Sequence, residues 1–319
     1  MILSLSYAIL WIMFRKTRNV FSNRRPRNSR KFCFLMICVF VFPAAFGGRE
    51  IAGQSPKVSP APPVLKRTTT RYETRRFAYG GTLTIVGPPQ GSIAIEGWQK
   101  SEVEISADIE WQANTEQDLN LLAAVDNFVL DEDADHLRIV TTGTHDKVFM
   151  RRVAKRFPKA LLGMPWRIDY RIKVPVSTDL EINAGNGPLR LAGVEGAMRV
   201  TALESDATLT LTGGSVMVTV GRGSIKLDVP TRSWRGAGVE ARLALGELQV
   251  GLPAGFNADI NADILRTGTI ANDYPALVPR ERAGSTARSL KASTGSGGAT
   301  LSFTVGDGTI SIKQMSVTP

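Results

Sequence analysis

Short segments in which apolar and polar residues alternate recur along most of the chain, and each follows a small residue, usually glycine. Alternation has the period of a β-strand, so it places the apolar side chains on one face and the polar side chains on the other. A leading glycine is typical of a tight corner, because a residue without Cβ adopts positive φ at no steric cost. The segments begin at Gly81, Gly91, Gly187, Gly196, Ala207, Gly214, Gly223, Gly246, Gly268, Gly298 and Gly308.

The repetition of these segments predicts an all-β fold. Between Gly187 and Gly223 the segments start nine residues apart on average. Nearly identical units in succession favour a single-stack β-solenoid or β-helix-like repeat domain, in which each level packs on a copy of itself. A β-sandwich is the alternative, because sandwiches also have turns at this spacing. In the solenoid we expect a continuous interior that contains Leu189, Leu209, Val216 and Ile225.

The composition divides the chain into three parts. Residues 1–48 form a targeting segment, since a basic stretch precedes an apolar run that ends in small residues, as in a secretory signal. That run, of about fifteen residues, is shorter than the roughly 20 needed to cross a bilayer, which favours cleavage over a membrane hairpin with the apolar residues 1–14. Residues 49–76 are predicted to be a Pro-rich linker. Residues 77–315 hold the β-repeats.

The basic character of the chain is concentrated at its start. The formal net charge is +10, and residues 1–50 hold nine Lys or Arg against one acid, so +8 lies there and +2 remains for the rest. A nearly neutral β-domain is not a nucleic-acid-binding surface. Both cysteines, Cys33 and Cys38, lie in the apolar run, so the domain has neither disulfides nor thiolate metal sites.

One segment has helical spacing. Thr115 and Asp118 resemble a capping box, and Leu119 and Leu122 follow with helical periodicity, which predicts one short helix over 115–125. A hairpin with an acidic turn at 131–135 should follow it. Residues 148–166 are basic and irregular and are interpreted as a loop.

The order of these motifs resembles the bacterial putative-adhesin family, whose domains of unknown function contain β-helical, self-similar repeats related to adhesin head domains. The resemblance rests on residues 91–98 with 103–105, on the step Val174-Pro175 before the densest repeats, and on the closing segments 297–301 and 307–312. It covers residues 77–313. The resemblance implies an envelope or cell-surface protein with an adhesive or scaffolding role, and it supplies no catalytic residues.

Motifs for metal and cofactor binding are incomplete. Asp131, Asp133 and Asp135 have calcium-loop spacing, but His136 and Thr142 occupy the places of the required Gly and Glu. The glycines at 236 and 238 lack the preceding strand and following helix of a dinucleotide site. No hydrolase signature motif occurs. We therefore predict no catalytic, cofactor-binding or metal-binding residue.

One basic cluster lies within the β-domain, next to Trp166. Its charge suits anionic lipid headgroups, lipopolysaccharide or acidic glycans, with affinity that falls as salt rises. A solvated loop is the alternative interpretation. The cluster consists of Arg151, Arg152, Lys155, Arg156, Lys159 and Arg167.

These features together predict an exported, non-enzymatic binding or scaffold protein of the cell envelope or surface. Its partner would be an envelope glycan, a lipid headgroup or a surface protein, and not a nucleic acid. Two alternatives remain open. One is a polysaccharide-degrading β-helix enzyme that uses outward carboxylates such as Asp259 and Asp263. The other is an envelope-stress or assembly accessory protein.

Overall fold

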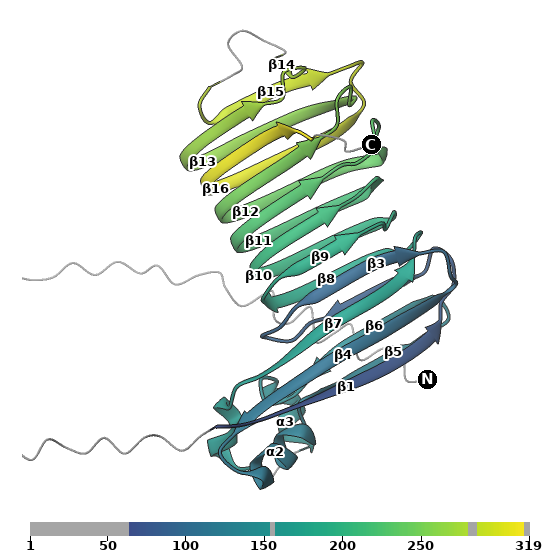
Figure 1. Ribbon diagram of the computed structural model, residues 1–319, viewed down its shortest axis with the longest axis vertical. Helices are drawn as coiled ribbons and strands as arrows, with labels where there is room; N and C mark the ends of the chain where they lie inside the picture. Colours follow the sequence, from purple (N-terminus) through teal and green to yellow (C-terminus); the bar gives the residue numbers. More distant parts are fainter. Residues whose placement is uncertain (1–63, 154–156, 280–285, 316–319) are drawn as a thin grey trace, which may run out of the picture. The chain divides into compact units, whose positions relative to one another are not determined.

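Nearly all regular structure of the protein is β (Figure 1), and the strands form one hydrogen-bonded network. The computed structural model describes residues 64–153, 157–279 and 286–315. The prediction of an all-β fold is confirmed. Across the described ranges no helix has the length and apolar character needed to span a bilayer. In chain order the elements are β1 (Leu65–Arg76), β2 (Thr82–Val86), β3 (Ile93–Trp98), β4 (Glu102–Ala113), α2 (Glu116–Ala123), β5 (Asn127–Glu132), β6 (His136–Thr142), α3 (Lys147–Val153), the 3-10 helix η1 (Lys159–Gly163), β7 (Trp166–Pro175), β8 (Asp179–Asn186), β9 (Leu189–Ala192), β10 (Ala197–Thr210), β11 (Gly213–Asp228), β12 (Arg235–Leu252), β13 (Ala258–Asp273), β14 (Val278–Pro279), β15 (Ser289–Thr294) and β16 (Ala299–Gln314).

Each long strand from β10 onward consists of two arms that meet at a bend. In β11, Val216 and Val220 are buried before the bend, and Ile225 and Leu227 are buried after it. The buried positions change from even to odd numbers at 221–223, so both arms turn their apolar side toward one core cluster. The buried positions also shift by one at the bend in the other long strands, from even to odd numbers in β10 and from odd to even numbers in β12 and β16. One strand therefore contains two of the alternating segments seen in the sequence.

The strands stack in parallel and in register, so equivalent residues form rows along the stack. Parallel pairing connects β8, β10, β11, β12, β16 and β13 in that order through their first arms, and β3, β9 and β10 through the second. The predicted inward orientation of four residues is confirmed, because Leu189, Leu209, Val216 and Ile225 are at most 3% exposed. Each such side chain contributes about 1.5–3 kcal/mol through burial.

Glycines form a column along the bends, which we call the corner column: Gly223, Gly246, Gly308 and Gly268, with Ser205 at the β10 level. The four glycines have φ between 124° and 142°. A Cβ on Gly246 would lie 1.8 Å from the carbonyl oxygen of Gly223. The bend thus needs glycine for two reasons, the positive φ and the close approach of the next backbone.

The order of the stack differs from the order of the chain at one place. Strand β16 lies between β12 and β13 and pairs in parallel with both, although β13, β14 and β15 precede it in the sequence. Strand β15 then pairs antiparallel with β13, and β14 pairs antiparallel with β15. Figure 1 shows β16, in yellow, between these two green strands.

The predicted linker over 49–76 is wrong for residues 65–76. These residues form β1, which pairs antiparallel with β4 along its full length. The polar sequence concealed a strand because β1 buries few apolar side chains and instead forms ion pairs such as Lys66–Glu110 and Arg75–Glu73. Charged edge strands of this kind resist pairing with other chains. The targeting segment and residues 49–63 lie outside the described residues.

The predicted helix over 115–125 is present as α2. Thr115 caps it, and its hydroxyl accepts a hydrogen bond from the N–H of Asp118 at 3.1 Å. The predicted hairpin is formed by β5 and β6. The interpretation of 148–166 as a loop, and with it the expectation of one helix only, is wrong, because α3 and η1 lie there. Asp146 starts α3 by accepting hydrogen bonds from the N–H groups of Val148 and Phe149.

Candidate functional site

A largely apolar pocket, which cationic side chains also line, lies between α3 and η1, and we call it the basic pocket. Its volume is about 940 Å³, which is within the usual range for a ligand site. The apolar lining comes from Met150, Phe157 and Leu162, and the last of these is 44% exposed. The remaining lining residues are Thr144, His145, Lys147, Arg151 and Lys159.

Helix geometry brings two of the cations together. Lys147 and Arg151 are four residues apart on α3, so their side chains share one face of the helix. The guanidinium Nε of Arg151 donates a hydrogen bond to the carbonyl of Lys147 at 3.1 Å. Lys159 reaches the same pocket from η1. Among the described residues no carboxylate forms an ion pair with any of these three cations, so they are available to an anion.

The loop that supplies Thr144 and His145 is held by a buried carboxylate. Asp126 follows α2 and has no exposed surface, and its Oδ1 accepts a hydrogen bond from the N–H of Thr144 at 2.6 Å. A Cβ on Gly143 would lie 2.3 Å from that oxygen, so the loop can approach Asp126 this closely only because residue 143 is glycine. Burial raises the pKa of Asp126 to about 6, although the hydrogen bonds from Thr144 act in the opposite direction. Asp126 thus positions one wall of the basic pocket.

His145 contributes an aromatic surface and little charge. Its ring centroid lies 5.4 Å from that of Trp166, the first residue of β7. Burial lowers the pKa of His145, partly offset by the nearby charge of Asp146. At neutral pH the imidazole is therefore uncharged, and the cationic character of the pocket comes from lysine and arginine.

The structure divides the basic cluster predicted from the sequence. Arg151 and Lys159 line the pocket, and Arg152 is exposed on α3 without lining it. Arg167 lies on β7 and pairs with Asp169 at 2.7 Å, so its charge is already neutralised. Lys155 and Arg156 lie outside the described residues.

Sequence reasoning missed Lys147 and the apolar lining of the pocket. The signal that could have found Lys147 is its spacing of four residues from Arg151, which has meaning only once a helix is expected there. Met150, Phe157 and Leu162 were overlooked because the surrounding charges suggested a solvated loop.

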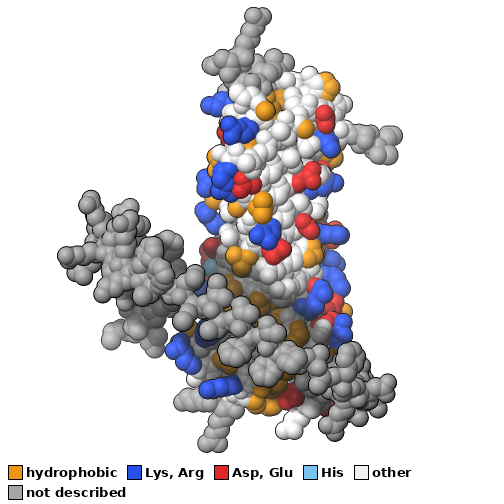
Figure 2. All heavy atoms as spheres, turned by 90° about the vertical axis from the view of Figure 1, so that its left-hand side faces the viewer, with side chains coloured by type: hydrophobic (Ala, Val, Ile, Leu, Met, Phe, Trp, Pro, Cys, Tyr) orange, Lys and Arg blue, Asp and Glu red, His pale blue; other side chains and the backbone are white. Residues whose placement is uncertain are grey.

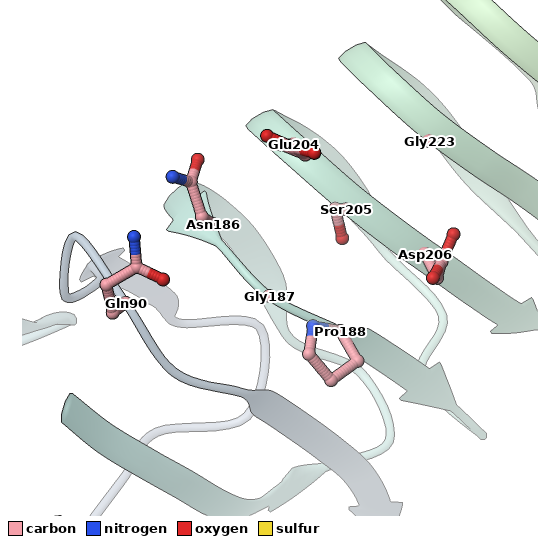
Figure 3. A pocket seen from close by; sticks show the side chains of 8 residues that line it. All are labelled: Gln90, Asn186, Gly187, Pro188, Glu204, Ser205, Asp206 and Gly223. Carbon is pink, nitrogen blue, oxygen red and sulfur yellow. The ribbon is translucent and has the colours of Figure 1, made fainter. Parts of the chain in front are cut away.

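A second hollow, of about 470 Å³, lies at the bends of β8 to β10 (Figure 3). Three neighbouring levels contribute the side chains of Gln90, Asn186 and Glu204, which are aligned by the strand register. Ser205 lines the same hollow, but its hydroxyl is buried and has no hydrogen-bond partner among the described residues. Asp206 accepts a hydrogen bond from Ser224 at 2.7 Å. The hollow is polar and anionic, in contrast to the basic pocket.

Other sequence motifs have structural roles in the fold. Asp131 and Asp133 form ion pairs with Arg138 across the β5–β6 hairpin. The glycines at 236 and 238 lie within β12. Asp263 accepts a hydrogen bond from Ser289 on β15. In the described ranges no group of three or more His, Cys, Asp or Glu side chains could hold a metal ion.

Comparison with known proteins gives distant structural similarities. No family model matches the chain, and no curated protein matches it. A putative cell adhesion protein from Clostridium sporogenes is 16% identical, with a TM-score of 0.41 over 77% of this chain and 100% of its own. A putative adhesin from Bacteroides fragilis is 10% identical, with a TM-score of 0.33 over 77% and 97%. One from Parabacteroides merdae is 9% identical, with a TM-score of 0.23 over 78% and 97%. At these scores the similarities carry no argument about family or function.

Proposed function

We propose that the protein is an exported, non-enzymatic binding module of the bacterial adhesin type, whose β-solenoid domain holds a pocket for anionic lipid. Export is supported by the order of basic, apolar and small residues in the targeting segment. The solenoid is supported by the in-register parallel levels, each with both arms on one strand, since the two sheets of a sandwich are usually built from separate strands.

The observation that carries the ligand class is the combination of charge and apolar surface in the basic pocket. Met150, Phe157 and Leu162 offer an apolar surface to an acyl chain, and Lys147, Arg151 and Lys159 meet an anionic headgroup. A free anion would need only the cations, and a neutral apolar ligand only the apolar lining. The proposed occupant is therefore an anionic lipid in a bilayer surface.

Vesicle flotation tests this proposal. The protein should bind phosphatidylglycerol vesicles and not phosphatidylcholine vesicles, with binding weakened at high salt. The triple substitution K147Q/R151Q/K159Q removes three charges, each contributing about 1 kcal/mol near an anionic surface, so affinity should fall roughly 100-fold. Leu162→Asn should also weaken binding, because it places a polar amide where an acyl chain would pack.

The matched control removes the same charge elsewhere. R190Q/R199Q/K291Q changes three exposed cations on the strands and should leave vesicle binding unchanged. Circular dichroism checks that every variant is folded. Equal binding to both vesicle types, or equal loss in the two triple variants, would show that the basic pocket is not a lipid site.

A further inference from the structure

Exposed leucines occur at every second level along the bends of the stack. Leu203 on β10 is 70% exposed, Leu245 on β12 is 43% exposed, and Leu265 on β13 is 66% exposed. The levels follow the order β10, β11, β12, β16 and β13. Four steps of about 4.8 Å therefore separate the outer two leucines by roughly 19 Å. Figure 2 faces these bends and shows apolar patches alternating with charged groups down the stack.

Charged residues occupy the levels between the leucines or lie beside them. Glu204 is next to Leu203, and Arg222 of β11 is the register neighbour of Glu204. Leu245, Asp307 and Thr267 continue the same row on β12, β16 and β13. Arg266 forms an ion pair with Asp307, and their side chains are 63% and 30% exposed. Among the described residues neither Glu204 nor Arg222 forms an ion pair.

The pattern of leucines and charges along the bends is complementary to the same pattern read in the opposite direction along the stack. Rotation by 180° about an axis through Leu245 exchanges β10 with β13 and β11 with β16. Leu203 then faces Leu265 of a second copy, and Leu245 faces its own equivalent. Arg222 faces Asp307, and Glu204 faces Thr267, whose chain neighbour is Arg266, so each charge lies opposite or beside one of the opposite sign. A twofold contact requires this relation, in which residue i meets j and j meets i.

We propose that the bends from β10 to β13 form a homodimer contact in which two copies associate antiparallel about Leu245. Leucine contacts supply the apolar surface, and the two kinds of charge pair fix the register and exclude the parallel arrangement. A contact along five levels is narrow, so the dimer is weak and depends on protein concentration. We assign a second copy of the chain to this surface because the surface is complementary to itself after the twofold rotation.

Cysteine cross-linking tests the geometry. In the full chain with Cys33 and Cys38 changed to serine, Leu245→Cys should give a disulfide-linked dimer, because the axis brings the two equivalent residues within disulfide range. Leu203→Cys alone and Leu265→Cys alone should stay monomeric, and a mixture of the two should give the heterodimer. Leu121→Cys, at an exposed position on α2, is the control and should not cross-link.

Sedimentation velocity tests the energetics. Arg222→Asp places like charges opposite Asp307 twice in each dimer, so the dissociation constant should rise tenfold or more. Lys291→Asp, on the strand β15, should leave it unchanged. The proposal is overturned if the wild-type protein remains monomeric at high concentration. It is equally overturned if Leu203→Cys cross-links to itself, or if Leu245→Cys cross-links no faster than Leu121→Cys.

Discussion

Replacing Asp126 with asparagine tests whether this buried carboxylate makes the stability of the protein depend on pH. Oδ1 of Asp126 accepts the N–H of Thr144, while Oδ2 is buried and has no partner among the described residues. Asparagine keeps the accepting oxygen and removes the charge. Any constant cost of the new amide shifts stability equally at all pH values, so the informative quantity is how the difference between variant and wild type changes with pH.

The magnitude follows from the pKa of Asp126. Burial raises it from 3.8 to about 6, against the hydrogen bonds from Thr144. Because the folded pKa lies above the unfolded pKa, the folded state binds the proton more strongly, and wild-type stability from this group rises as pH falls from about 6 to about 4. At 1.36 kcal/mol per pKa unit, the penalty at neutral pH is about 3 kcal/mol. Asp126→Asn lacks this pH-dependent penalty.

Urea unfolding followed by tryptophan fluorescence measures the effect. The unfolding free energy of Asp126→Asn minus that of wild type should increase by about 3 kcal/mol between about pH 4 and pH 7.5. Asp135→Asn, at an exposed position in the hairpin turn, controls for loss of a carboxylate and should show no such change. A difference between Asp126→Asn and wild type that is constant with pH would refute the reasoning.

Three further substitutions test the fold. Gly246→Ala should cost about 3 kcal/mol or more, because its Cβ would overlap a carbonyl oxygen at positive φ, whereas Gly163→Ala, with open space around it, should cost little; urea unfolding compares the two. Thr115→Ala should cost about 1 kcal/mol through loss of the α2 cap, and a larger loss would mean that Thr115 does more than cap. Tyr274→Phe should cost about 1–3 kcal/mol in thermal unfolding, because the buried hydroxyl donates to the carbonyl of Pro253 at 2.8 Å; an unchanged midpoint would contradict this.

The sequence predicted the fold best at positions where a residue type has one structural role, such as glycine at a bend with positive φ. Alternation identified the interior rows that contain Leu189 and Val216, and the glycines predicted corners with positive φ, which Gly223 and Gly246 have. Local patterns do not specify which strands are neighbours, because pairing depends on contacts far apart in the chain. The sequence of the polar strand β1 therefore indicates a linker, since the stability of this strand comes from β4 and from ion pairs that no local pattern shows.

The sequence indicates a basic cluster, but not the pocket that two of its residues line. Arg151 and Lys159 were recognised by their charge, but the helix α3 that aligns Lys147 with Arg151 was not expected. Asp126 gave no signal at all, because burial and the contact with Thr144 arise only when the end of α2 meets the loop after β6. A titratable group of this kind becomes visible only in three dimensions.

The position of β16 constrains how this end of the domain is made. Since β16 is synthesised after β13, the edge of β12 has no partner from its own chain until residues 299–314 have left the ribosome. An uncovered parallel edge can recruit a strand from another molecule. Chains that stop before residue 299 would lose an internal level of the stack and leave both β12 and β13 open, so a premature stop there should yield aggregates rather than a shortened but intact domain.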